Sequence, residues 1–265
     1  MLPKNIGLKS LLFYIRDRLY RVRNLDYGIF DAFFFPKAMD QWTRYADITR
    51  DIQDANLKGR RIKSVLDVGA AEGRITNFLN PLIYDITIVD VQRTKLNKKS
   101  FVETIVGDGC KLPFRNKVFD ATISVDTYEH IPKGLRSTFL GELQRVCKKR
   151  LILHFPLQSD NGYFSGGTYD IKFQHLFKQL YGFEEANTAE HIKSIHPNLN
   201  EVKNIIPQAE IRGSRNCVVW LKYKVMSLKR VRGFLAGIFY CLFLKKSDSS
   251  PPYWGCMIIC DFEEQ

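Results

Sequence analysis

The sequence lacks an apolar run long enough to cross a membrane, and it lacks the marks of a secretory leader. Its longest apolar stretch, from Phe234 to Leu244, falls far short of the roughly 20 residues that span a bilayer. The N-terminus has neither the apolar core nor the small-residue cleavage site of a signal peptide. These absences predict a cytoplasmic protein that contacts a membrane at most peripherally.

Paired cysteines, internal repeats and low-complexity tails are also missing. None of the cysteines forms a Cys-x-x-Cys pair, and no histidines at matching spacing accompany the last two of them. This pattern predicts free thiols in a reducing compartment. No other group of residues has the spacing of metal ligands, so the sequence predicts no metal site. The six cysteines are Cys110, Cys147, Cys217, Cys241, Cys256 and Cys260.

What the chain does have is the composition of an ordinary globular protein with an excess of positive charge. Its 265 residues suit one large domain with elaborations. The hydrophobic fraction of 45% and the charged fraction of 26% exclude wholesale disorder. Against 28 Asp and Glu, 40 Lys and Arg give a net charge of +12. That charge predicts an anionic partner and leaves nucleic acid, anionic lipid and a phosphorylated substrate open.

Residues 1–58 are predicted to form a helical extension or lid. Apolar residues recur at helical spacing from Leu8 to Val22, with Lys and Arg on the other faces, which predicts a basic amphipathic helix. A second helix is predicted over 37–56, after the aromatic stretch that ends at Pro36.

From Ile62 onward, short β-branched runs alternate with helical segments, as in the βαβ units of a parallel sheet. Strands are predicted at 62–68, 86–90, 101–106, 121–125 and 151–155, with helices at 73–80 and 134–148. A Gly- and Ser-rich loop at 157–172 precedes a helix near 173–181. Two last strands, 209–213 and 254–262, flank a basic and then apolar segment at about 216–246.

The first predicted strand runs into a turn of small residues, Val65-Leu66-Asp67-Val68-Gly69-Ala70-Ala71-Glu72-Gly73. Small residues let a ligand approach the backbone, and the start of the next helix offers unpaired N–H groups. Asp90 ends the second strand, 21 residues after Gly69. An acidic side chain at that place accepts hydrogen bonds from both hydroxyls of a ribose. The two features predict a nucleotide-like cofactor and leave NAD open.

A third element decides between these cofactors. It consists of Gly107-Asp108-Gly109-Cys110-Lys111-Leu112-Pro113-Phe114, then Phe119-Asp120-Ala121-Thr122-Ile123-Ser124 and Tyr128-Glu129-His130-Ile131-Pro132. Over roughly residues 60–156 the series resembles the type-11 class I S-adenosylmethionine (SAM)-dependent methyltransferases. With the alternating pattern, the resemblance implies a Rossmann-like α/β fold: a seven-stranded, mostly parallel sheet with helices on both faces. Residues 59–265 are then the SAM-binding domain, with substrate-side insertions at about 157–205 and 214–248.

The resemblance also implies a cofactor site, residue by residue. It places Asp67, Gly69, Ala71 and Gly73 around the amino-acid part of SAM and Asp90 at the ribose. It places Val91 on the face of the adenine, and Asp108 with the backbone of Gly109 and Cys110 at the adenine edge. Ser124 to Asp126 then line the sulfonium end. Many members of the family have glycine where this chain has Ala71, a departure that narrows the backbone angles of the turn.

Methyl transfer to oxygen requires an aligned nucleophile and benefits from a general base. His154 follows the fifth predicted strand, where ligands sit in open α/β sheets, although a hydrogen-bonded structural histidine fits that place as well. His130 belongs to the Glu-His-Ile-Pro element of the family. A third candidate, His191, lies in the segment between the fifth and sixth strands.

The acceptor is less defined. The expected acceptor is a small molecule, a sugar or a lipid-linked glycan, methylated at oxygen. The alternatives are an RNA methyltransferase, for which the basic and aromatic segment 212–232 would grip nucleic acid, and a SAM-binding interaction protein without turnover. The apolar centre of 230–246, flanked by cations, also suits the edge of an anionic bilayer, as does the basic N-terminal helix. Packing against the core remains open for both segments.

Overall fold

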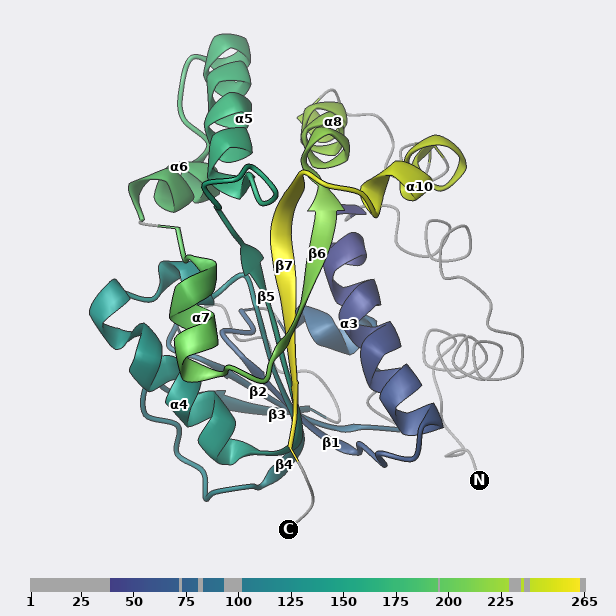
Figure 1. Ribbon diagram of the computed structural model, residues 1–265, viewed down its shortest axis with the longest axis vertical. Helices are drawn as coiled ribbons and strands as arrows, with labels where there is room; N and C mark the ends of the chain where they lie inside the picture. Colours follow the sequence, from purple (N-terminus) through teal and green to yellow (C-terminus); the bar gives the residue numbers. More distant parts are fainter. Residues whose placement is uncertain are drawn as a thin grey trace.

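The computed structural model describes residues 39–71, 73–80, 83–92, 102–194, 196–228, 235 and 239–262. At its centre is a seven-stranded sheet with the strand order β3-β2-β1-β4-β5-β7-β6 (Figure 1). The strands are β1 (Ser64–Val68), β2 (Asp85–Asp90), β3 (Val102–Val106), β4 (Phe119–Val125), β5 (Cys147–Pro156), β6 (Glu210–Asn216) and β7 (Tyr253–Asp261). The predicted amphipathic helix between Leu8 and Val22 lies outside the described residues.

The first five strands run parallel, and only β7 runs against its two neighbours, β5 and β6. The inner strands are apolar on both faces: Val65, Leu66 and Ile123 are all fully buried. Such strands appear in sequence as continuous β-branched runs rather than as alternating patterns. The prediction of a seven-stranded, mostly parallel Rossmann-like sheet, closed by an interrupted hairpin, is confirmed.

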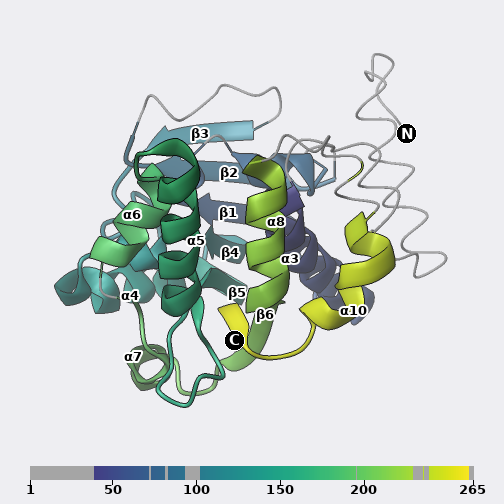
Figure 2. The ribbon, with the colours of Figure 1, turned by 90° about the horizontal axis from the view of Figure 1, so that it is seen from above.

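Helices cover both faces of the sheet and also its carboxyl edge. In Figure 1, α4 and α7 lie against one face and α3 against the other. Seen from above, α5, α6 and α8 stand over the strand ends (Figure 2). The helical segments are α3 (Met39–Leu57), η1 (Arg74–Asn77), η3 (Tyr128–His130), η4 (Lys133–Leu135), α4 (Arg136–Val146), α5 (Gly166–Tyr181), α6 (Ala186–Lys193), α7 (Leu199–Ile205), α8 (Cys217–Leu228), η5 (Tyr240–Leu244) and α10 (Lys245–Asp248).

Three local predictions were wrong in type or extent. The predicted helix at 73–80 is only the short 3-10 helix η1, because Gly73 is left-handed (φ 65°) and Pro81 disfavours helix at the residue before it. The helix predicted to end at 148 ends at Val146, since the next residues join β5. Helix α5 begins at Gly166, inside the predicted loop, where a side chain would collide with the backbone of Trp254.

Helix α3 is firmly packed on the sheet. Ile48 and Ile52 are fully buried against the core, and Asp51 pairs with Arg150 of β5 at 2.7 Å and with Arg212 of β6 at 2.9 Å. Helix α3, which forms the last third of the predicted extension at 1–58, therefore packs against one face of the sheet. Among the residues that the structure describes, no helix is long and apolar enough to cross a membrane.

Candidate functional site

A cavity of about 660 Å³ opens at the carboxyl edge of the sheet. It lies where β1 and β4 are neighbours and the strand order reverses, the place at which open α/β sheets bind ligands. Its volume is within the range of small-molecule sites. Eight predicted site residues line it: Gly69, Ala71, Asp90, Val91, Asp108, Gly109, Asp126 and His130.

The turn after β1 brings backbone, rather than side chains, to the cavity wall. Gly69 has a φ of 75°, and a Cβ there would run into the side chain of Thr127. Ala71 also adopts a left-handed backbone, with a φ of 46°. That conformation costs a non-glycine residue about 1–2 kcal/mol. Ala71 therefore holds a left-handed turn at some cost in strain.

Asp90 ties this turn to the end of β2. One carboxylate oxygen accepts a hydrogen bond from the amide of Ala71 at 2.9 Å, and the other accepts one from the amide of Gln92 at 2.8 Å. A carboxylate has about four acceptor positions, so two remain for a ligand. The next residue, Val91, is 68% exposed and offers an apolar surface at the cavity. Paired acceptors beside an apolar wall suit a ribose that carries a flat base.

The turn after β3, at Gly107 to Gly109, also lines the cavity. Asp108 accepts a hydrogen bond from the amide of Cys110 at 2.8 Å, which closes the turn. A Cβ at Gly109 would lie 2.5 Å from the ring of Phe139, so only glycine lets the backbone pass there. Neighbouring side chains thus require glycine at both turns, and contact of these turns with a cofactor remains a prediction.

Other predicted site residues lie behind the cavity wall. Asp67 is fully buried, and the hydroxyl of Ser124 donates a hydrogen bond to the carbonyl of Val68 at 2.9 Å, which joins β4 to β1. Gly73 and Cys110 also lie outside the lining. These four residues shape the cradle from behind in the structure, and direct contact with SAM remains a prediction for them.

His154 lies below the floor of the cavity. It is 1% exposed, and both ring nitrogens have partners: Nδ1 is 3.0 Å from Asp126 and Nε2 is 2.9 Å from the hydroxyl of Ser214. Asp126 also forms an ion pair with Arg44 of α3. Arg44 lines the cavity, whereas His154 does not. The histidine thus holds Asp126 in place at the cavity wall.

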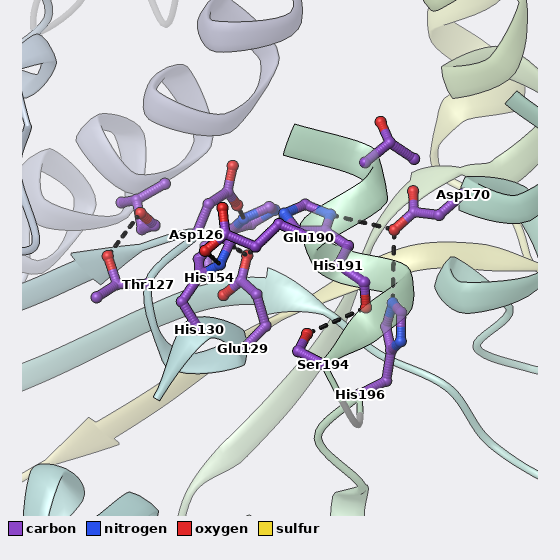
Figure 3. A network of polar contacts seen from close by, with 12 residues as sticks. Asp126, Thr127, Glu129, His130, His154, Asp170, Glu190, His191, Ser194 and His196 are labelled. Atoms are coloured by element: carbon purple, nitrogen blue, oxygen red, sulfur yellow. Dashed lines mark hydrogen bonds and ion pairs between the residues drawn. The ribbon is translucent and has the colours of Figure 1, made fainter. Parts of the chain in front are cut away.

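Two further histidines, His130 and His191, lie close to three carboxylates (Figure 3). His191 of α6 lies 3.1 Å from Asp170 of α5 through Nδ1 and 3.8 Å from Glu129 of η3 through Nε2. His130 lies 4.0 Å from Glu129 through Nε2 and 3.4 Å from Glu190 through Nδ1. We call these five residues the histidine–carboxylate cluster.

Burial and charge set the protonation of this cluster. Burial raises the pKa of the Glu129 carboxyl to about 7, against the attraction of His191. Burial also acts to raise the pKa of Asp170, but hydrogen bonds from His191, His196 and Trp254 lower it below its ordinary value. For His191, burial acts to lower the pKa, and the two carboxylates outweigh it and raise the pKa. A carboxyl that titrates near neutral pH thus lies beside an imidazole that is readily protonated.

Trp220 and Lys224, which the sequence analysis considered only within a nucleic-acid-binding segment, line the cavity together with Trp254. Trp220 of α8 and Trp254 of β7 are stacked, with ring centroids 5.2 Å apart at 17°, and the Lys224 ammonium lies 5.7 Å from the Trp220 ring. The spacing of four residues on a helix places Trp220 and Lys224 on one face. That spacing was the available signal, and the prediction instead treated the segment as a surface. Arg74, which follows the glycine turn, also lines the cavity.

Residues 66–155 match the profile of the methyltransferase domain family. The chain carries a class I SAM-dependent methyltransferase domain. The matched residues of this methyltransferase domain run from β1 to β5 and include the turns after β1, β2 and β3. The prediction of a methyltransferase with SAM as cofactor is confirmed at the level of the family. No curated protein sequence matches the chain.

Solved structures share the fold of this methyltransferase domain at low sequence identity. A SAM-dependent methyltransferase from Archaeoglobus fulgidus is 14% identical, covers 82% of this chain and 94% of its own, and has a TM-score of 0.50. Magnesium protoporphyrin IX methyltransferase from Synechocystis PCC 6803, solved with bound SAH, is 13% identical. The match covers 96% of this chain and 95% of that protein, with a TM-score of 0.50. At these identities the similarity concerns the fold.

Proposed function

We propose that this methyltransferase transfers a methyl group from SAM to an oxygen of a small-molecule or sugar acceptor, free or lipid-linked. The observation that carries the proposal is the single cavity, which joins the predicted cofactor cradle to a stacked pair of tryptophans and the histidine–carboxylate cluster. A methyl donor and an acceptor in one enclosed space meet the main requirement of the reaction, which is alignment.

The cofactor side has a group for each part of SAM. Asp90 would hold the ribose, Val91 the adenine face and Asp108 the adenine edge. The guanidinium groups of Arg44 and Arg74 line the cavity near the glycine turn and suit the carboxylate of the amino-acid part. When bound, SAM supplies an electrophilic methyl carbon on its positive sulfonium.

The acceptor side combines apolar surface with polar groups. Trp220 and Trp254 are almost fully buried and stack on each other, which makes this wall apolar and rigid, and Lys224 adds a positive charge for an anionic acceptor. Helices α5, α6 and α8 of the predicted insertions supply much of this side, so we propose that the insertions select the acceptor. We place removal of the hydroxyl proton at His130 and its cluster, and we assign His154 a positioning role through Asp126.

Turnover is tested by incubating the purified protein with methyl-labelled SAM and fractions of small molecules, glycans and lipid-linked glycans. The proposal expects label in an alkali-stable ether product together with an equal amount of S-adenosylhomocysteine. Trp220→Ala should abolish product formation with little change in SAM affinity, because Trp220 lies on the acceptor side. Tight SAM binding without S-adenosylhomocysteine from any fraction would favour the alternative of a binding protein without turnover.

The RNA alternative receives less support from the fold. Of the basic and aromatic residues on which it rested, Trp220 is 2% exposed, Arg215 lies over the ring of Trp254 at 4.3 Å, and Arg212 pairs with Asp51. Trp220 and Arg215 are thus buried, and the exposed Arg212 is already paired with Asp51 and Glu210. An RNA fraction in the turnover assay tests this alternative directly.

We also propose that this methyltransferase attaches peripherally to anionic membranes. Phe239, Leu242 and Phe243 of the segment at 239–243 are 41%, 61% and 66% exposed, and two lysines follow at 245–246. Each cation near an anionic surface contributes about 1 kcal/mol. We expect co-sedimentation with anionic vesicles at low salt and its loss in Leu242→Asp/Phe243→Asp. Leu180→Asp on α5, where Leu180 is 55% exposed, is the matched control and should sediment like the wild type.

Equal sedimentation of the wild type and the double variant would show that the exposed residues at 239–243 do not carry membrane contact. Binding to neutral vesicles as strong as to anionic ones would contradict the electrostatic part of the proposal.

A further inference from the structure

Three side chains of the histidine–carboxylate cluster direct ligand atoms to one point. Glu129, His130 and His191 each contribute one such atom, and all three atoms lie within 4.8 Å of one another. Four ligands arranged tetrahedrally 2.0–2.1 Å from a zinc ion lie about 3.3 Å apart. The Nε2 atoms of the two histidines are 4.0 and 3.8 Å from the same oxygen of Glu129, so small rotations close the set. We propose that Glu129, His130 and His191 bind one divalent first-row cation of the Zn²⁺ type.

The state of Glu129 is an independent reason to expect a cation. Its side chain is 1% exposed, and neither carboxylate oxygen has a hydrogen-bond partner among the described residues. A buried carboxylate is costly unless it is paired, hydrogen bonded or bound to a metal. The two imidazoles nearby are too far away for hydrogen bonds. A cation between the three groups supplies the missing partner.

The remaining nitrogens of both histidines face carboxylates, as in metal sites. Nδ1 of His191 is 3.1 Å from Asp170, and Nδ1 of His130 is 3.4 Å from Glu190. Histidine ligands of metals donate this second N–H to an acceptor, which orients the ring and leaves the other nitrogen free for the ion. Asp170 is itself held by the Trp254 indole at 2.8 Å, so this support is rigid. Three carboxylates around two imidazoles also give the charge that a divalent cation requires.

The site would be open on one side. His130 and His191 line the cavity next to the stacked tryptophans, whereas Glu129 lies behind them. Two histidines and one glutamate fill three positions of the ion, which leaves at least one position toward the acceptor. With the ion bound, His130 would act as a ligand and not as the base. An acceptor hydroxyl bound to the ion would have a lowered pKa, and its proton would leave to solvent through the cavity mouth. Only this role of the cation rests on the proposed function, whereas binding of the cation does not.

Metal binding is tested on the full chain after treatment with a chelator and its removal. Titration with Co²⁺, followed by visible absorption, and competition with Zn²⁺ should show one equivalent of tightly bound cation. Glu129→Gln and His130→Ala should each weaken binding about 100-fold or more, and Asp170→Asn about 10- to 100-fold, as for groups that orient ligands. His175→Ala, which removes an exposed histidine of α5 outside the cluster, should bind as tightly as the wild type.

Circular dichroism checks that each variant is folded. If Glu129→Gln misfolds because Glu129 is buried, His130→Ala still tests the site, since His130 is 29% exposed. Binding of no cation by the wild type, or wild-type affinity for the cation in Glu129→Gln and His130→Ala, overturns the site. SAM affinity of the metal-free protein separates the two proposals. SAM binding and turnover by the metal-free protein overturn the catalytic role of the cation and leave the proposed function standing. A cation bound at these residues in a protein that never converts SAM supports the metal site while the proposed function fails.

Discussion

Asp90→Ala is expected to lower the affinity for SAM by roughly 5- to 150-fold, which corresponds to a loss of about 1–3 kcal/mol. The carboxylate has two acceptor positions left after it binds the amides of Ala71 and Gln92. The two hydroxyls of the SAM ribose are predicted to fill them, and without Asp90 both hydroxyls would lose their partners. Titration calorimetry at fixed salt measures the change.

A control on the same strand separates this contact from general damage to β2. Asp85 begins β2 at its opposite end and forms only an exposed pair with Lys63 at 3.4 Å. Asp85→Ala should therefore bind SAM like the wild type. Asp90→Ala also removes the acceptor of the Ala71 amide, so the melting temperature without SAM must be compared first. Unchanged SAM affinity in a folded Asp90→Ala would show that the cofactor assignment is wrong.

The cofactor half of the site could be predicted because its chemistry depends on local sequence. A buried strand, a turn of small residues and an acid at the end of the next strand occur within 30 residues, and each is required by backbone geometry. Gly69 and Gly109 lie where any Cβ would collide with a neighbour. Such positions can be recognised in the sequence as glycines, and the buried strands of the sheet can be recognised as β-branched runs.

The acceptor half could not be predicted in the same way because it depends on tertiary contacts. Glu129 and His191 are far apart in sequence and meet only because α6 packs beside η3 at the edge of the sheet. The basic character of α8 suggested a surface, yet Trp220 packs on Trp254 from a strand more than 30 residues later. The prediction that His154 follows the end of the fifth strand was wrong, because β5 runs on to Pro156. The ring of His154 lies behind the cavity, between Ser214 and Asp126, which lines the cavity.

The largest loss of stability is expected from Asp51→Ala. Asp51 is 5% exposed and accepts hydrogen bonds from Arg150 at 2.7 and 3.1 Å and from Arg212 at 2.9 Å. Removing one partner of a buried ion pair costs about 3–5 kcal/mol, because the remaining charge is left buried. Arg150 keeps Asp261 at 2.6 Å, and Arg212 keeps Glu210, so the low end, about 3 kcal/mol, is expected. Urea unfolding measures this difference.

Asp47→Ala is the matched control, since Asp47 lies one turn earlier on α3 and makes an exposed pair with Arg50 at 3.3 Å. Exposed pairs contribute about 0–1 kcal/mol. Helix α3 also carries Arg44 into the cavity, so its attachment to β5 and β6 fixes a wall of the cofactor site. Asp51→Ala should therefore also bind SAM more weakly than Asp47→Ala at the same temperature. Equal stability of the two variants would mean that the apolar contacts of α3 alone hold it on the sheet.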